Sequence, residues 1–230
     1  MNICGLEKFS LVDYDNYVTC TVFTKGCNFV CPFCHNSSLV IAEKYAENIK
    51  EEEVFNYLTK RKAVVDAVCI TGGEPTLQPD LKEFIKKVKA MGFKVKLDSN
   101  GTKPEVLQDL INEKLIDYVA MDIKNSFEKY AQTVGVNQLD LNKIAKSIEI
   151  LKNSGIDYEF RTTIIEEFHT KHDMEEIAKI VSGAKNYAVQ KFVDNGECIT
   201  HNLHEVEKSV AEDFVEIVRP YVKNIKIRGY

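Results

Sequence analysis

Residues 17–36 have the sequence "YVTCTVFTKGCNFVCPFCHN", in which an apolar segment runs into three closely spaced cysteines. The segment "YVTCTVF" (17–23) has the β-branched and aromatic composition of a strand. Cys27, Cys31 and Cys34 follow it in a C-x3-C-x2-C pattern, and His35 comes directly after the third cysteine. A strand that leads into a loop of clustered thiols predicts a metal or cofactor site at the edge of a sheet.

The rest of the chain alternates between short apolar segments and segments with helical periodicity. Short β-branched runs predict strands, whereas apolar residues three or four positions apart predict helices. We expect strands at 17–23, 66–71, 93–98, 117–123, 157–165 and 186–192. We expect helices at 48–61, 80–91, 104–114, 139–153, 173–183 and about 204–218, before a last segment "NIKIRGY" (224–230).

Strands that alternate with helices form parallel sheets with right-handed crossovers. Six such units are too few for a closed eight-stranded barrel, so the sequence predicts an α/β fold with an open, partial (β/α)6 TIM-like barrel. A C-terminal helix and a short terminal strand complete the expected architecture. We expect one domain over 1–230, with an N-terminal extension at 1–16, a barrel core at 17–192 and a C-terminal helix and tail at 193–230.

Ligands of such folds bind where strands end and the following loops begin. The cysteines follow the first expected strand, "TGGEP" (71–75) follows the second, and "DSNG" (98–101) ends the third. "MDIK" (121–124) ends the fourth, Arg161 lies in the fifth and Gln190 lies in the sixth. Because these distinctive residues lie at the same end of successive strands, they predict one shared site.

The composition restricts the expected partners and location. The 230 residues carry a formal net charge of −5 with acidic and basic residues interleaved, so nucleic acid is not an expected partner. The opening "MNICGLEKFSLVDYD" lacks the pattern of a signal peptide, and no apolar run approaches the length of a membrane span. We therefore expect a cytoplasmic protein without a membrane partner. In that reducing compartment, Cys4, Cys20, Cys69 and Cys198 are expected to be small buried side chains.

The residues alone leave four interpretations of the clustered cysteines. A zinc site would need His35, but adjacent residues rarely both reach one tetrahedral ion. "CPFCH" also matches the c-type haem pattern, which belongs to exported proteins. A redox C-x-x-C pair would leave Cys27 unexplained. A 4Fe–4S cluster normally takes four thiolates, so three cysteines would leave one iron open, which is useful when a substrate binds there.

The motifs together resemble those of the radical S-adenosylmethionine (SAM) enzymes. The cysteine pattern, with the aromatic Phe33 in its last gap, is similar to the signature of that family. "TGGEP" is similar to its Gly-Gly-Glu segment, and "LDSNGT" (97–102) to its ribose-contacting strand end. The resemblance covers essentially the whole chain. It implies the radical SAM type of partial barrel, SAM as a cofactor, and a 4Fe–4S cluster on Cys27, Cys31 and Cys34 with one open iron.

The resemblance also implies roles for residues beyond the cysteines. The open iron would bind the amino and carboxylate groups of SAM. The implied cofactor-binding residues are Gly72, Gly73, Glu74, Asp98, Asn100, Lys124, Arg161 and Gln190. By similarity to glycyl-radical-enzyme activases, Asp98 and Asp122 would frame a monovalent cation near the SAM carboxylate.

Several of these residues also have a simpler structural interpretation. Gly72 and Gly73 suit an ordinary strand-to-helix turn, and Asn100 suits an Asx-type turn. Asp122 and Lys124 would form an ion pair at the mouth of the barrel.

Arg161 lies in an apolar strand, where an unpaired charge is costly. Its partner would be either the carboxylate of SAM or a neighbouring Asp or Glu. The remaining histidines lie in polar stretches and are expected on the surface; they are His169, His172, His201 and His204.

The implied reaction starts with an external one-electron donor such as flavodoxin or ferredoxin, which reduces the cluster. SAM is then cleaved to methionine and a 5′-deoxyadenosyl radical, which abstracts one hydrogen atom. No catalytic residue is needed beyond the cluster and SAM.

Three segments resemble anaerobic ribonucleoside-triphosphate reductase activating proteins, which install a glycyl radical on that reductase. They are "GLEKFSLVDYDNYVTCTVFTKGCNFVCPFCHNSSLV" (5–40), "AMDIK" (120–124) and "YAVQKF" (187–192). The chain departs from this group at "DYDNY" (13–17), where Pro-Gly is more usual, which loosens the assignment to the subgroup.

Other classes of function remain open at this point. One is a radical SAM enzyme that acts on a small molecule, such as a deazapurine precursor, or on another glycyl radical enzyme. Another is a zinc-binding interaction module without enzymatic activity. The end of the chain, "IKIRGY" (225–230), resembles the glycyl-radical loop of the target enzymes. It is therefore either a mimic of that loop or, on its alternating pattern, an edge strand.

Overall fold

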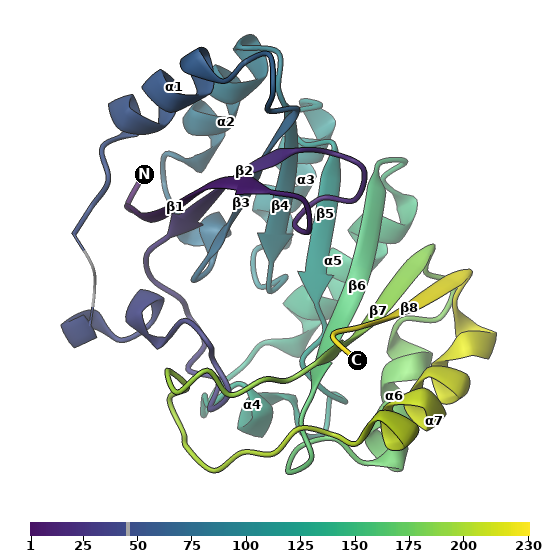
Figure 1. The fold of residues 1–230 in the computed structure, drawn as a ribbon. Helices are drawn as coiled ribbons and strands as arrows, with labels where there is room; N and C mark the ends of the chain where they lie inside the picture. The colour runs from purple at the N-terminus through teal and green to yellow at the C-terminus, as the bar shows by residue number, and fades with distance from the viewer. Residues whose placement is uncertain (45–46) are drawn as a thin grey trace.

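The computed structural model describes residues 1–44 and 47–230. Its centre is an eight-stranded sheet whose spatial order follows the chain (Figure 1). The strands are β1 (Ile3–Ser10), β2 (Thr19–Thr24), β3 (Ala67–Gly72), β4 (Lys94–Ser99), β5 (Tyr118–Asp122), β6 (Asp157–Ile164), β7 (Asn186–Lys191) and β8 (Asn224–Arg228). β1 pairs with β2 in antiparallel orientation, and every later neighbouring pair is parallel.

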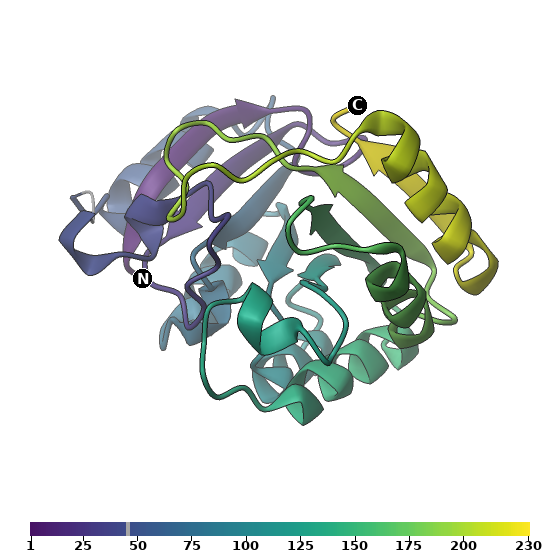
Figure 2. The ribbon, with the colours of Figure 1, turned by 90° about the horizontal axis from the view of Figure 1, so that it is seen from below.

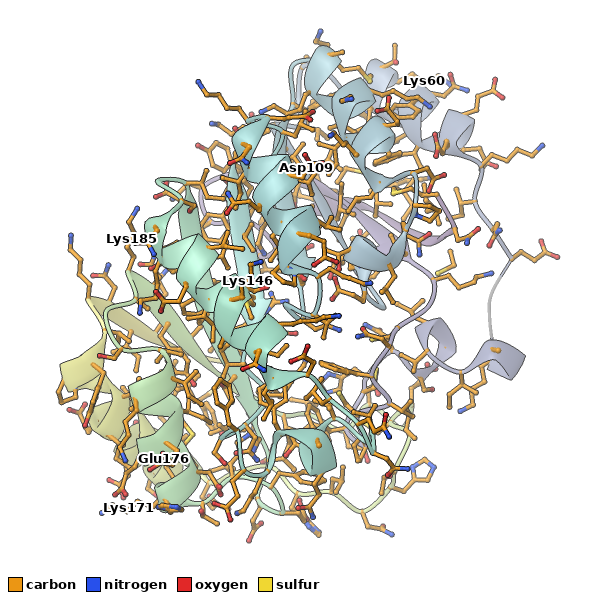
Figure 3. The ribbon with its side chains drawn as sticks, turned by 180° about the vertical axis from the view of Figure 1, so that it is seen from behind. Lys60, Asp109, Lys146, Lys171, Glu176 and Lys185 are labelled. Atoms are coloured by element: carbon orange, nitrogen blue, oxygen red, sulfur yellow. The ribbon has the colours of Figure 1, made fainter. Side chains whose placement is uncertain are left out.

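Helices connect the parallel strands and cover the outer face of the curved sheet (Figures 1 and 2). The α-helices are α1 (Glu51–Lys60), α2 (Leu81–Ala90), α3 (Pro104–Asn112), α4 (Tyr130–Thr133), α5 (Leu141–Asn153), α6 (Lys171–Ile180) and α7 (Lys208–Val218). Short 3-10 turns are η1 (Ser37–Leu39), η2 (Ala42–Lys44), η3 (Pro75–Leu77) and η4 (Arg219–Tyr221). Figure 3 shows charged side chains such as Asp109 and Lys146 on the outer helices α3 and α5.

The sequence explains why these elements form. β3, with the sequence "AVCITG", is buried along most of its length, as expected of a strand that is covered on both faces. α6 begins with a capping box in which Thr170 and Asp173 each accept a hydrogen bond from the other residue's backbone N–H. α3 begins at Pro104, where a missing N–H costs no helical hydrogen bond.

The predicted α/β partial barrel is confirmed. Each expected strand and helix is present with its ends shifted by a few residues, and "NIKIRGY" contributes the edge strand β8. The sheet is not closed, because β1 and β8 are its two edges. Among the described residues, no helix is both long enough and apolar enough to cross a lipid bilayer.

The strand β1 was not predicted, because residues 1–16 were expected to be only an extension. Its sequence "ICGLEKFS" has no strict apolar alternation, and only its first and last residues are buried. It forms because the backbone pairs with β2 and shields what would otherwise be an unpaired strand edge.

The loop between β1 and β2 lies against the N-terminal ends of the barrel strands. Its Tyr14 packs on Tyr118 at the start of β5, with ring centroids 5.2 Å apart. The ammonium of Lys96 donates a hydrogen bond to the backbone carbonyl of Asp13. Asp15 pairs with Lys226 on β8, so this loop bridges the two edges of the open barrel.

Candidate active site

One cavity of about 470 Å³ lies at the C-terminal ends of the barrel strands. Every residue that was predicted for the site lines this cavity. These residues are Cys27, Cys31, Cys34, Gly72, Gly73, Glu74, Asp98, Asn100, Asp122, Lys124, Arg161 and Gln190. The roles assigned to them by resemblance stay predictions.

The cysteine-bearing loop follows β2 and is fixed by backbone hydrogen bonds at several points. The N–H of Gly26 donates to Leu39 across the loop (2.7 Å), and the N–H of Cys34 donates to Cys31 (3.0 Å). The segment between β7 and α7 passes over this loop (Figure 1), where the N–H of Thr200 donates to the carbonyl of Pro32 (2.8 Å). The chain's own backbone therefore holds the loop from both sides.

All seven cysteines are free thiols. Burial raises the pKa of Cys27 to about 12 and that of Cys31 to about 11, although the nearby charge of Lys124 partly opposes the shift at Cys31. These thiols therefore stay protonated at neutral pH unless a strong Lewis acid binds them. The shift reflects burial alone, because burial also raises the pKa of Cys20, which lies outside the cysteine pattern, to about 12.

The cavity fits an iron–sulfur cluster in its donor set. Soft thiolates are the usual ligands of iron–sulfur clusters, and three of them line one cavity here. His35, next to Cys34, also lines the cavity, and its buried Nε2 has no hydrogen-bond partner among the described residues. Among the described residues, no group of three or more His, Cys, Asp or Glu is arranged around a single ion. A four-iron cluster does not need such a group, since each thiolate binds a different iron.

The glycines of the Gly-Gly-Glu segment are required by the packing of the chain itself. A Cβ on Gly73 would lie 2.1 Å from the carbonyl oxygen of Gly26, just before the first cysteine. Gly72 has a φ of +119°, and a Cβ there would lie 2.3 Å from the backbone nitrogen of Thr24. The contacts of the chain itself therefore account for both glycines, and their close approach to SAM stays a prediction.

Glu74 is buried, and its hydrogen-bond partners are groups of the protein itself. Its carboxylate accepts hydrogen bonds from Thr76 on η3, from the hydroxyl of Ser99 (2.9 Å) and from the backbone N–H of Asn100 (2.6 Å). Burial raises the pKa of Glu74, and these donated hydrogen bonds oppose that shift. Glu74 thus connects the end of β3 to the end of β4.

Asn100 forms the predicted Asx-type turn and also reaches the cysteine loop. Its Oδ1 accepts from the backbone N–H of Thr102 (3.1 Å), and its Nδ2 donates to Oδ1 of Asn28 (2.8 Å). Asn28 in turn donates to the hydroxyl of Thr102 (2.9 Å). Sequence reasoning did not single out Asn28, although its place between two of the cysteines was a signal.

A network of charged side chains occupies the side of the cavity formed by β4, β5 and β6. Asp122 lies directly opposite Arg161 in the pairing of β5 with β6, so their side chains share one face. Arg161 binds both Asp122 and Asp98, Lys124 Nζ lies 2.8 Å from Asp122, and Lys96 Nζ lies 3.1 Å from Asp98. The neighbouring carboxylates expected as partners of Arg161 are therefore present, and its contact with the carboxylate of SAM stays a prediction.

The network keeps its carboxylates charged. Burial by itself would raise the pKa values of Asp98 and Asp122. The guanidinium of Arg161, together with Lys96 and Lys124, instead holds both pKa values below the usual range. Lys124 also lies with its Nζ 5.9 Å from the centre of the Phe33 ring, which places this charge beside the cysteine loop.

His169 corrects one expectation, because it is buried rather than exposed. Its Nδ1 accepts from the backbone N–H of Ile165 (3.1 Å), so its Nε2 carries the proton and donates to the carbonyl of Lys124 (2.9 Å). The neighbouring Phe168 packs on Phe33, with ring centroids 5.9 Å apart. His169 follows β6, but its place after a strand predicts neither its burial nor its two backbone partners.

The remaining expectations are mostly met. His172, His201 and His204 are exposed, Cys20, Cys69 and Cys198 are buried, and Cys4 is half-buried. Gln190 lies on β7 at the cavity wall. The tail is the predicted edge strand: Arg228 makes two hydrogen bonds of 2.9 Å to Glu159, and the hydroxyl of Tyr230 donates to Val206.

The fold and cavity define an open parallel α/β barrel whose ligand site carries three thiols at the end of its first parallel strand. The chain belongs to the radical SAM superfamily, because the model of that superfamily matches residues 21–181. It is therefore an enzyme of the radical SAM class, and membership implies a 4Fe–4S cluster and SAM as its cofactors.

Individual relatives agree with this assignment. A protein of Methanocaldococcus jannaschii assigned to the glycyl-radical enzyme activating enzymes is 37% identical over 232 residues, which covers 98% of this chain and 95% of the relative. A protein of Pyrococcus horikoshii assigned to the GTP 3′,8-cyclases is 30% identical over 118 residues, which covers 51% of this chain and 37% of the relative. The crystal structure of Streptococcus suis SuiB bound to SAM has the same fold, with a TM-score of 0.68 at 16% identity over 88% of this chain and 48% of SuiB.

Proposed function

We propose that this protein is an activating enzyme that generates a glycyl radical on anaerobic ribonucleoside-triphosphate reductase. The observation that carries the proposal is that three free thiols and the charged and polar ends of β3 to β6 line the same cavity. The nearly full-length relative of M. jannaschii supports the activase class. The resemblance of segments 5–40, 120–124 and 187–192 to activators of this reductase supports the particular target.

Cys27, Cys31 and Cys34 would hold the 4Fe–4S cluster and leave one iron for SAM. When bound and reduced, the cluster and SAM together supply the 5′-deoxyadenosyl radical that removes a hydrogen atom from the target glycine. Glu74 holds the backbone of Asn100 at the end of β4, where the ribose of SAM would bind. Gly73 allows the Gly-Gly-Glu segment to approach the cysteine loop.

The charged network would receive the carboxylate of SAM. Its members in the cavity wall include Arg161 and Lys124, and its two carboxylates are already paired. A monovalent cation between Asp98 and Asp122 stays a prediction from resemblance, and the ion pairs observed there weigh against it. The proposal also includes a flavodoxin or ferredoxin as electron donor and a cytoplasmic location.

The test is an electron paramagnetic resonance spectrum of the chain after anaerobic reconstitution with iron and sulfide. The sample contains a chemical reductant, SAM and an anaerobic ribonucleotide reductase. We expect a glycyl-radical doublet that is absent in a Cys31→Ala control. If SAM changes the signal of the reduced cluster but no glycyl radical appears, the reductase is not the target, although the assignment to radical SAM chemistry still holds.

The second candidate is a radical SAM enzyme that acts on a small molecule. The relative assigned to the GTP 3′,8-cyclases favours this candidate, although the similarity covers only 51% of this chain. The discriminating measurement is the rate of 5′-deoxyadenosine formation. The activase predicts that this rate responds to the reductase protein, whereas the alternative predicts a response to GTP or a deazapurine precursor alone.

A further inference from the structure

The position expected for a monovalent cation already holds a positive charge of the chain itself. The guanidinium of Arg161 lies between the two carboxylates that would frame the cation. Its Nη2 lies 3.0 Å from Oδ2 of Asp98, and its Nε donates to Oδ1 of Asp122. Because Arg161 is directly opposite Asp122 in the sheet, this bridge follows from the register of β5 and β6.

The other oxygens of both carboxylates are also engaged. Oδ1 of Asp98 lies 3.1 Å from Lys96 Nζ, and Oδ2 of Asp122 lies 2.8 Å from Lys124 Nζ. All four carboxylate oxygens therefore have a cationic partner from the chain. A sodium or potassium ion would have to displace one of these partners before it could bind.

The charge balance of the network argues in the same direction. Three cationic side chains and two carboxylates give a net charge of +1, and the exposed fractions of these side chains lie between 6% and 24%. A further cation would raise the net charge in a poorly solvated place, which is unfavourable. A carboxylate ligand would instead make the network neutral.

We infer that the guanidinium of Arg161 takes the place of a monovalent cation, so that this enzyme binds SAM without sodium or potassium. The inference rests on the proposed function only in taking SAM as the ligand. Arg161 is here a positioning residue: it holds Asp98 and Asp122 apart and neutralises them. The surplus positive charge of the network then receives the carboxylate of SAM.

The first experiment measures how monovalent cations affect the wild-type protein. SAM affinity of the reconstituted enzyme and the melting temperature of the cluster-free chain are measured in sodium, potassium and tetramethylammonium chloride at equal ionic strength. We expect the SAM dissociation constant to agree within about twofold among the three salts. A gain of about tenfold or more in sodium or potassium would overturn the inference.

The second experiment removes the guanidinium. Arg161→Ala leaves two carboxylates and two lysines around an empty volume, which a small cation can enter. We expect this variant to bind SAM about tenfold or more weakly in tetramethylammonium, and to recover most of that loss in sodium or potassium. The melting temperature of its cluster-free chain is expected to rise in the same two salts.

Arg228→Ala is the matched control, because Arg228 also makes a two-point ion pair within the sheet, to the buried Glu159. Glu159 does not line the cavity, and the second carboxylate near Arg228, that of Asp15 at 4.0 Å, is exposed and paired with Lys226. We expect this variant to melt at a lower temperature without any preference for sodium or potassium. A folded Arg161→Ala variant that shows no cation effect would overturn the inference.

A third variant covers the case in which Arg161→Ala does not fold. Arg161→Lys keeps the positive charge, so we expect it to stay independent of the salt even if its SAM affinity falls. A cation requirement in Arg161→Lys would overturn the inference. Failure of the wild type to bind SAM at all would instead contradict the proposed function, while the melting temperatures would still test the role of Arg161.

Discussion

The backbone N–H of Asn100 donates a hydrogen bond of 2.6 Å to Oε2 of Glu74. This bond connects the Gly-Gly-Glu segment after β3 to the turn that ends β4. The same turn reaches the cysteine loop through Asn28, so the three strand ends form one connected structure. Glu74 therefore shapes the cavity by holding the backbone of the turn that ends β4.

Replacement of Glu74 by glutamine should weaken this connection. Glutamine has one acceptor oxygen, and its amide group would face a backbone or hydroxyl donor that has lost its partner. An unsatisfied buried donor costs about 1–3 kcal/mol, so we expect the free energy of unfolding to fall by that amount in urea denaturation. SAM affinity of the reconstituted protein should fall with it. Glu53→Gln on the exposed face of α1 is the control, and equal stability of the two variants would contradict the prediction.

Replacement of Gly73 by alanine should disrupt the contact between the Gly-Gly-Glu segment and the cysteine loop. The added Cβ would meet the carbonyl oxygen of Gly26 at 2.1 Å, and backbone atoms cannot move aside as a flexible side chain can. We expect a loss of stability of about 1–3 kcal/mol and a lower iron content after reconstitution. Gly155→Ala, which has φ of +77° and open space around its Cβ, is the control. It should lose stability but retain iron.

The iron content should distinguish the three spaced cysteines from Cys198, a buried thiol outside the cysteine pattern. Cys198 lies in the segment that passes over the cysteine loop, where Thr200 binds Pro32. We expect Cys34→Ala to lose most of the bound iron and sulfide, because it removes one of the three cluster thiolates. Cys198→Ala should keep them. An equal loss of iron in the two variants would mean that Cys198 is also a ligand.

Much of this site could be predicted because its chemistry lies at the ends of strands that the sequence marks clearly. The cysteine spacing and the order of strands and helices predict that Cys27, Asp98 and Arg161 lie close together, and all three line one cavity. The reason is topological: in a parallel sheet with regular crossovers, all strands end on the same side.

The features that could not be predicted depend on contacts between distant segments. β1 has no clear alternation, and its formation depends on the exposed edge of β2. His169 lies in a polar stretch, yet its two ring nitrogens satisfy backbone groups of Ile165 and Lys124, which removes the cost of burying it. The local sequence around β1 and around His169 does not show which distant backbone groups each of them pairs with.

The burial of His169 should make stability depend on pH. Burial lowers the pKa of this histidine below its ordinary value of 6.5. Near pH 6.5 the unfolded chain therefore binds a proton that the folded chain does not, so acid favours unfolding. The stabilising contribution is complete above pH 6.5 and is lost progressively as the pH falls through the lowered folded-state pKa. Asp98 and Asp122 also have lowered pKa values, but carboxylates add their effect at lower pH, below their ordinary value of 3.8.

The measurement is the free energy of unfolding of the cluster-free chain between pH 8 and pH 5. One additional proton bound by the unfolded chain gives a slope of up to about 1.4 kcal/mol per pH unit, and His169→Gln should remove that part of the slope. His204→Gln is the matched control, because exposed His204 has its pKa raised by its hydrogen bond to Glu167. Its contribution is present below pH 6.5 and is lost as the pH rises, so this control should keep the acid-side slope. An unchanged slope in His169→Gln would show that the buried histidine is not the group that titrates.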